Sequence, residues 1–325
     1  MITLLSVFGV FGLSAVLIKS AEIVVSSIRR IARETQIPGV VVSAVVISVA
    51  TSLPELFVGL ASSLSGTSSL SLGNVVGANI SNLSLVLGLA GLLAGTIYIH
   101  ETGFLKKEWL FSFGLGIAPM LLLYDRGLSR IDGIILLCLY GVYVSLLFRR
   151  KVGEVERGDA EWSRVLRNIK EHRGPFGHSL ARFFGGLAVL LLAAEGLVRL
   201  STGVAESMGV PLFLVGLLVV SVGTTLPEIA FSYRSIKDGA PGLIIGNLLG
   251  TLAFNSTFVL GIVALISPIE VSARRSYIFA VGAYILAGLL FWIFVRSKRR
   301  LGRWEAFLLL ALYLTFFAVQ MYFDY

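Results

Sequence analysis

The sequence predicts an all-α integral membrane protein with ten transmembrane helices, arranged as two inverted repeats of five helices each. Three observations lead to this prediction. The 325 residues are 56% hydrophobic and only 14% charged, with a mean hydropathy of +0.88, far outside the range of soluble domains. Ten apolar segments are long enough to cross a bilayer. A single offset relates the first half of the chain to the second.

The ten segments approach or exceed the roughly 20 residues that a membrane helix needs. The predicted helices lie at 2–25, 38–62, 70–95, 107–124, 131–148, 179–199, 211–233, 242–267, 276–296 and 304–323. The first segment lacks the basic region and the cleavage site of a secretory signal, so we expect it to remain as the first helix.

The net charge of +8 follows from the distribution of Lys and Arg along the chain. If the N-terminus is outside, the inner loops carry twenty Lys and Arg residues and the outer loops carry five. This bias predicts a multi-pass protein of the plasma membrane with both termini extracellular. The basic residues are thereby explained by the lipid bilayer; we expect no nucleic-acid partner, and no protein partner is evident from the sequence.

The repeat has an offset of 173 residues and gives nineteen identical pairs out of fifty-one between positions 42 and 92. The polar identities carry the most weight, because apolar matches are common in any membrane protein. They pair Ser48 with Ser221, Thr51 with Thr224, Glu55 with Glu228, Asn74 with Asn247, and Asn82 with Asn255.

The offset divides the chain into a first five-helix repeat (1–148), a cytoplasmic linker (149–178) and a second five-helix repeat (179–325). An odd number of helices means that the second repeat enters the membrane upside down relative to the first. Inverted repeats of this kind are typical of secondary transporters, which bind their substrate near mid-membrane at the repeat interface.

One motif occurs as "ATSLPELFVG" at 50–59 and again as "GTTLPEIAFS" at 223–232. Pro54 and Pro227 cannot donate a hydrogen bond to the carbonyl four residues earlier, and each leaves an oxygen without its helical partner. Helical spacing places further oxygens on the same face. The first repeat contributes Ser48, Thr51 or Ser52, and Glu55, and the second contributes Ser221, Thr224 or Thr225, and Glu228. Oxygen ligands without nitrogen or sulfur favour hard cations such as Ca²⁺ and Na⁺.

The next helix of each repeat contains "LGNVVGANISN" and "IGNLLGTLAFN". We expect its small-residue pairs, Gly73 with Gly77 and Gly246 with Gly250, to allow close helix packing. One helix face also carries buried amides and hydroxyls, which either join the cation site or serve packing. These residues are Asn74, Asn82, Asn247, Thr251 and Asn255.

Charge counting favours exchange over uniport. Two buried carboxylates neutralise one Ca²⁺ or two Na⁺, whereas an empty site leaves two unpaired anions in the membrane. Glu22 and Glu195 also recur at the same offset, but Lys19 and Arg199 lie at helical spacing from them. We therefore expect local ion pairs there.

These paired motifs resemble the cation/calcium exchanger superfamily, specifically the prokaryotic type of the sodium/calcium exchanger family. The resemblance implies a secondary-active antiporter that exchanges Na⁺ for Ca²⁺ by alternating access. It implies that Glu55 and Glu228 are shared ligands of the transported ions. The motif hydroxyls and carbonyls fall on Thr51, Ser52, Thr224 and Thr225, the backbone oxygens on Ser48 and Ser221, and the second-helix ligands on Asn82, Asn255 and Thr251.

The chain departs from the family pattern at three positions. Ala78 stands where a serine is usual, Asn255 where aspartate is frequent, and Leu252 where a polar residue is common. A proton-coupled or K⁺-coupled Ca²⁺ antiporter is the alternative, because the same glutamates could exchange Ca²⁺ for protons. No nucleophile with its base and no His-rich site is visible, so we expect neither an enzyme nor a cofactor. An internally inverted chain also fits a channel poorly.

Overall fold

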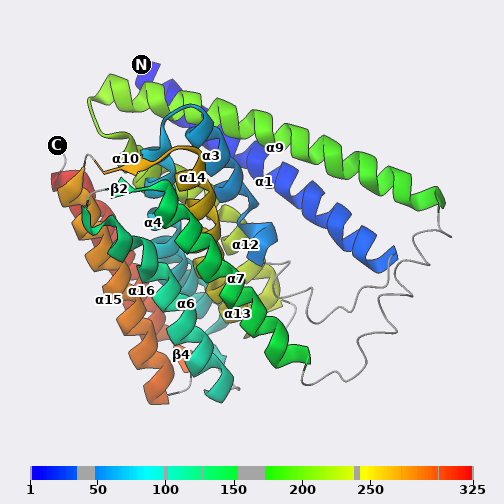
Figure 1. Ribbon diagram of the computed structural model, residues 1–325. Coiled ribbons are helices and arrows are strands. Elements are labelled where there is room, and N and C mark those ends of the chain that lie inside the picture. The colour runs from blue at the N-terminus through cyan, green and yellow to red at the C-terminus, as the bar shows by residue number, and fades with distance from the viewer. Residues whose placement is uncertain are drawn as a thin grey trace.

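The computed structural model describes residues 2–34, 48–98, 102–125, 127–152, 173–237, 242–271, 273–298 and 300–323, and these residues are mostly helical (Figure 1). A helical turn covers 48–51. The α-helices are α1 (Ile2–Glu34), α3 (Leu53–Leu64), α4 (Ser68–Ser81), α5 (Leu87–Ala94), α6 (Thr102–Leu122), α7 (Arg130–Val152), α9 (Arg173–Met208), α10 (Leu212–Val215), α11 (Ser221–Thr224), α12 (Leu226–Lys237), α13 (Gly242–Ala253), α14 (Leu260–Ile266), α15 (Arg274–Lys298) and α16 (Arg303–Phe323).

Short turns of other helix types join several of these helices into longer rods. The π-helical turns are η1 (Asn82–Val86), η3 (Gly216–Val220) and η4 (Phe254–Val259), and η2 (Leu123–Asp125) is a 3₁₀ turn. As a result α4, η1 and α5 form one rod, α10 to α11 form a second, and α13 to α14 form a third.

Seven helical stretches of the described residues are long and apolar enough to cross a membrane. They are Ser68–Ala94, Arg130–Leu147, Ala181–Met208, Leu212–Lys237, Leu243–Ile266, Arg274–Phe294 and Arg303–Tyr322. Two shorter apolar helices, Leu53–Leu64 and Trp109–Leu122, accompany them. Each of the ten predicted segments overlaps a helix of the described residues.

The helices are longer than the apolar segments suggested. Residues 29–34 were expected in a loop but form the last turns of α1, and α7 and α9 extend into the predicted linker to Val152 and from Arg173. Polar residues can continue a helix beyond the bilayer, because water or headgroups solvate their side chains. The rest of the predicted linker, 153–172, lies outside the described residues, as does the start of the second predicted helix, 38–47.

Helices α1 and α9 lie side by side and run in opposite directions across the rest of the bundle (Figure 1). Their contacts show the antiparallel order, since Gly9 faces Leu200 whereas Gly186 faces Val24. They contain 33 and 36 residues, which corresponds to about 50 Å each. This is longer than the roughly 30 Å hydrocarbon core, so both helices must tilt or project beyond it.

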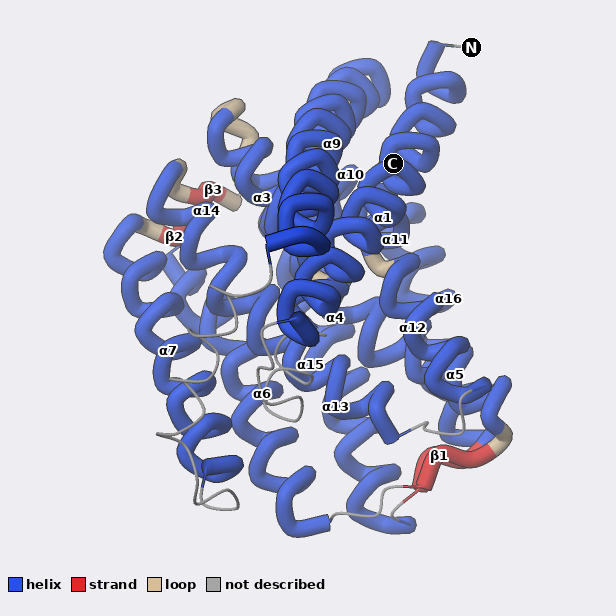
Figure 2. Tube along the Cα trace, turned by 90° about the vertical axis from the view of Figure 1, so that its right-hand side faces the viewer, coloured by secondary structure: helices blue, strands red, loops and turns tan. Residues whose placement is uncertain are grey.

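Within the described residues, four short strands depart from the all-α prediction. They are β1 (Thr96–Tyr98), β2 (Gly127–Leu128), β3 (Ile269–Glu270) and β4 (Arg300–Gly302). β1 pairs antiparallel with β4, and β2 pairs antiparallel with β3. The two pairs lie at opposite ends of the bundle (Figure 2). Segments of two or three residues between membrane helices carry too little periodicity to be recognised as strands.

Both sheets join the first half of the chain to the second around a buried aliphatic pair. Ile97 lies opposite Leu301, and Leu128 lies opposite Ile269. All four side chains are fully buried. The main hydrophobic core extends from these pairs through α4, α5, α13 and α15. A second core lies between α1, α9 and α3.

Candidate functional site

The proline motif interrupts the helix at the same place in both halves. The first interruption is at Ser52, between the turn at 48–51 and α3, and the second is at Thr225, between α11 and α12. The interruptions are 173 residues apart and lie two residues before Pro54 and Pro227. This agrees with the missing proline N–H predicted from the sequence. The helix axis continues across each break, because the amides on either side still bond to carbonyls four residues earlier.

Each following helix contains a π-helical turn where the predicted amide ligand stands. η1 begins at Asn82, and η4 includes Asn255, its counterpart 173 residues later. A π-turn inserts one extra residue and rotates the side chains that follow it, and such turns occur frequently at functional sites. Both amides are fully buried.

Glu55 and Glu228 are both fully buried, and the structure brings them together. Their carboxyl groups are close enough to repel one another. Thr224 interacts with Glu55, and Thr51 interacts with Glu228, so each glutamate meets a threonine from the opposite half. Neither contact has hydrogen-bond geometry, and all four carboxylate oxygens are buried without a hydrogen-bond partner.

The threonines link the two halves in a reciprocal manner. Thr224 Oγ1 donates to Asn74 Oδ1 at 3.0 Å, and the equivalent Thr51 Oγ1 reaches Asn247 Oδ1 at 3.5 Å. Thr51 Oγ1 also lies 3.5 Å from Thr251 Oγ1. Asn74 and Asn247 therefore each contact a motif threonine of the opposite half.

The backbone carbonyls of Ser48 and Ser221, which were predicted to be ion ligands, already accept hydrogen bonds within their own helices. The Ser48 carbonyl accepts from the Ser52 amide at 3.2 Å and from Thr51 Oγ1 at 3.3 Å. The Ser221 carbonyl accepts from the Thr225 amide at 3.0 Å and from Thr225 Oγ1 at 2.6 Å.

Glycines in α4 and α13 allow these helices to pack closely against residues of the other half. A Cβ on Gly77 would lie 2.3 Å from the Leu217 carbonyl oxygen, and one on Gly250 would lie 2.1 Å from Ser48 Oγ. Gly73 faces the Phe213 carbonyl in the same way. The prediction for Gly246 is not supported in the described part of the chain, where it has no neighbour within 4 Å.

Seven buried oxygen atoms of the predicted site residues have no hydrogen-bond partner. They are Oε1 and Oε2 of Glu55, Oε1 and Oε2 of Glu228, Oγ of Ser52, Oδ1 of Asn82 and Oδ1 of Asn255. Buried polar atoms are normally hydrogen-bonded, so such a concentration requires an explanation. Among the described residues, no three His, Cys, Asp or Glu side chains lie close enough together to hold a metal ion. The donor set thus consists of carboxylate, hydroxyl and amide oxygens, which suits a hard cation.

Two residues that hold the site were missed from the sequence. Asn79 Oδ1 accepts from Asn255 Nδ2 at 3.5 Å, and Asn79 Nδ2 donates to Ser256 Oγ at 2.7 Å. These bonds leave Asn255 Oδ1 free of a protein partner. Asn79 has no counterpart in the repeat, because the equivalent position of the second half is Leu252. The only indication in the sequence was that Asn79 is a polar residue within the motif "GNVVGANISN".

The other repeated glutamates are separate from this cluster. Glu22 pairs with Lys19 at 2.9 Å, and Glu195 pairs with Arg199 at 2.8 Å, so the predicted ion pairs are confirmed. Each pair lies exposed on its own long helix.

Comparisons with known proteins identify the family of the chain. The family profile described as sodium/calcium exchanger protein matches residues 5–149 and again residues 178–322. The inner membrane protein YrbG of Escherichia coli is 31% identical over 278 residues, which cover 84% of each chain. The sodium/calcium exchanger MaX1 of Methanosarcina acetivorans is 27% identical over 337 aligned positions, covering 94% of this chain and 95% of that one.

Among solved structures, the sodium-calcium exchanger NCX_Mj soaked with 10 mM Na⁺ superposes with a TM-score of 0.64 at 26% identity. The match covers 98% of this chain and 99% of that one. With both halves matched by one family profile and nearly the whole length matched by a known exchanger, the chain belongs to the sodium/calcium exchanger protein family of membrane-spanning antiporters.

Proposed function

We propose that the protein exchanges Na⁺ for Ca²⁺ across the membrane by alternating access, with both ions bound between Glu55 and Glu228. The observation that carries the proposal is the group of seven buried oxygens without hydrogen-bond partners, drawn from both halves of the chain. A cation between the halves would satisfy them together. The names of the relatives supply the identity of the two ions.

The proposed ligands divide by chemical type. Glu55 and Glu228 supply carboxylates shared by both ions. The remaining donors are the hydroxyls of Thr51, Ser52, Thr224, Thr225 and Thr251, the carbonyls of Ser48 and Ser221, and the amides of Asn82 and Asn255. Asn79 orients the Asn255 amide, so that its oxygen rather than its NH₂ group is available.

Repulsion between the carboxylates supports exchange rather than uniport. Two like charges at mid-membrane are unfavourable, and an isolated charge there already costs about 2.5–3.5 kcal/mol on insertion scales. One Ca²⁺ or two Na⁺ would neutralise both carboxylates. The empty site would keep its charge, which opposes reorientation without an ion.

Several features support two inverted repeats (1–148 and 179–325) joined by a cytoplasmic linker at 149–178, with ten transmembrane helices. The strands of one sheet correspond to those of the other at an offset of 173 residues, to within one residue, and the two sheets lie at opposite ends of the bundle. The reciprocal threonine-to-asparagine contacts and the antiparallel course of α1 and α9 fit the same in-plane two-fold axis.

The proposed location is the plasma membrane, with both termini extracellular. The excess of Lys and Arg in the inner loops supports this orientation. The start of α1 and the end of α16 lie toward the same end of the bundle, as an even number of crossings requires (Figures 1 and 2).

The proposal is tested in liposomes that contain the purified protein and are loaded with Na⁺, by following uptake of radioactive Ca²⁺ at fixed pH. We expect uptake to follow the Na⁺ gradient and to saturate. Glu55→Gln and Glu228→Gln should each abolish it, because each leaves one carboxylate to balance a divalent ion.

The matched controls are Glu22→Gln and Glu195→Gln, which change the other pair of glutamates related by the repeat. Both should retain transport, since neither residue belongs to the site. Uptake that ignores Na⁺ but follows an imposed pH or K⁺ gradient would replace Na⁺ with that coupling ion. Near-normal flux in Glu55→Gln and Glu228→Gln would refute the site itself.

A further inference from the structure

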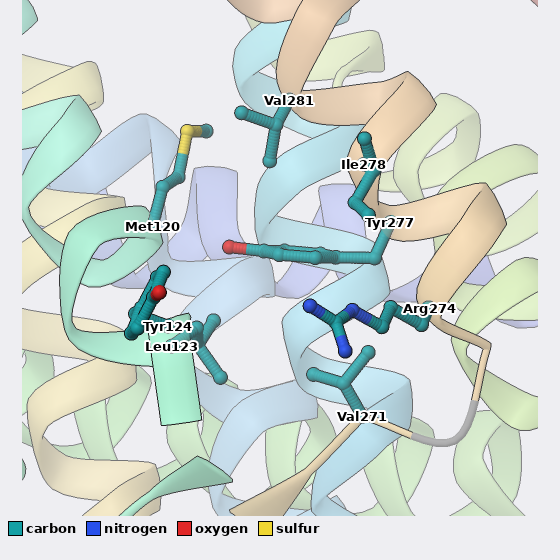
Figure 3. Close-up of a pocket in the computed structure, with 8 residues that line it drawn as sticks. All are labelled: Met120, Leu123, Tyr124, Val271, Arg274, Tyr277, Ile278 and Val281. Atoms are coloured by element: carbon teal, nitrogen blue, oxygen red, sulfur yellow. The ribbon is translucent and has the colours of Figure 1, made fainter. Parts of the chain in front are cut away.

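A cavity of about 250 Å³ lies between the end of α6 and the start of α15, and neither buried glutamate lines it (Figure 3). Met120 and Tyr124 line it on one side, and Arg274, Tyr277, Ile278 and Val281 line it on the other. The proposed ion exchange uses none of these residues.

One end of the cavity is polar. The guanidinium of Arg274 lies beside the ring of Tyr277, whose hydroxyl points across the cavity toward Met120 (Figure 3). Tyr277 is only 7% exposed, and its hydroxyl is buried without a hydrogen-bond partner. Arg274 has no ion-pair partner within the described ranges. The guanidinium of Arg274 and the ring of Tyr277 therefore line the same space, and the unpartnered Tyr277 hydroxyl lies buried at its edge.

The other end is apolar and continues onto the outer surface of the helices. Met120, Ile278 and Val281 form its wall, and Ile278 is 57% exposed. Leu121, next to Met120, is 71% exposed. Arg274 is the first residue of an apolar stretch that reaches Phe294. The cavity thus crosses the level where headgroups give way to acyl chains.

We propose that this cavity binds the headgroup of an anionic phospholipid, with the phosphate at Arg274 and the acyl chains along Ile278 and Leu121. Arginine binds phosphate oxygens through two parallel hydrogen bonds, and the Tyr277 hydroxyl would donate a third. Among the side chains that the structure describes, none that lines the cavity carries a carboxylate to attract the cation of a zwitterionic headgroup.

The size of the cavity fits this occupant. Pockets for complete drug-sized ligands measure about 300–1,000 Å³, so about 250 Å³ accommodates a phosphate with the first carbons of its chains. The Tyr277 ring also contacts Phe213 of α10, with ring centres 6.0 Å apart. A bound lipid would therefore brace the contact between α10 and α15, and we expect it to stabilise the fold.

The test measures lipid retention by native mass spectrometry and the apparent melting temperature in detergent, with phosphatidylglycerol or phosphatidylcholine added. The variants are Arg274→Gln and Tyr277→Phe, and the second keeps the ring contact with Phe213. Arg275→Gln is the matched control, because Arg275 is the neighbouring exposed arginine but does not line the cavity.

We expect phosphatidylglycerol to be retained and to raise the melting temperature more than phosphatidylcholine does. Arg274→Gln should weaken retention roughly tenfold, and Tyr277→Phe should weaken it by a smaller factor. Arg275→Gln should behave like the wild type. Equal losses of lipid retention in Arg274→Gln and Arg275→Gln would show that surface charge alone attracts the lipid, and this result would refute the proposed site. Displacement of the lipid by millimolar inorganic phosphate alone would show a free-anion site instead.

Discussion

Replacing Gly73 with alanine tests how closely the two halves must approach. A Cβ at Gly73 would lie 2.0 Å from the Phe213 carbonyl oxygen, whereas ordinary contacts begin near 3.4 Å. The α4 and α10 backbones would have to separate by about 1.4 Å, since the obstructing atom is backbone and cannot rotate away. Overpacking of this kind costs about 1–3 kcal/mol. The same shift would stretch the 3.0 Å bond between Thr224 and Asn74.

We therefore expect Gly73→Ala to lower the apparent melting temperature and to reduce Ca²⁺ uptake at least tenfold in liposomes. The matched control is Gly246→Ala, the equivalent position in the second half, which is exposed and has no neighbour within 4 Å in the described residues. It should leave both quantities unchanged. Wild-type stability and flux in Gly73→Ala would refute the view that this approach sets the geometry of the site.

Three other changes have defined outcomes. Thr224→Val removes a 3.0 Å hydrogen bond and should lower the free energy of unfolding by about 1 kcal/mol, as thermal unfolding would show. Thr51→Val removes only a 3.5 Å contact and should have a smaller effect. Equal effects of the two variants would contradict this order. Asn79→Leu, which copies the residue at the equivalent position, releases the Asn255 amide and should raise the KM for Ca²⁺ more than it lowers kcat, as initial uptake rates would show. An unchanged KM would remove Asn79 from the site. Ile97→Ala empties a fully buried position in the β1 and β4 pair and should cost about 2–4 kcal/mol by thermal unfolding while the protein stays folded, whereas a loss below 1 kcal/mol would show a loosely packed sheet.

Much of the helical arrangement could be predicted because hydrophobic length and the repeat offset are written directly in the sequence. The interruption at Ser52 and Thr225 followed from the missing N–H of the proline two residues later. The meeting of Glu55 and Glu228 followed from an odd number of helices in each repeat. These inferences depend on covalent properties of single residues or on a count, and neither requires knowledge of packing.

Other features could not be predicted because they arise from contacts between the halves. The π-turns at Asn82 and Asn255 have no characteristic amino-acid composition by which they could be recognised in the sequence. Asn79 holds Asn255 across the interface without a counterpart in the repeat, so self-comparison could not reveal it. The cavity beside Arg274 and Tyr277 likewise depends on where α6 ends relative to the start of α15.

The two small sheets have a consequence for how the molecule assembles. Each closes one end of the bundle with a strand from either half, and each threonine-to-asparagine contact also crosses between halves. Half of the chain alone would therefore have an open strand edge at both ends and an unmatched set of polar groups between them. We therefore expect that two halves expressed separately in one membrane would pair with each other through the same strands and threonine contacts.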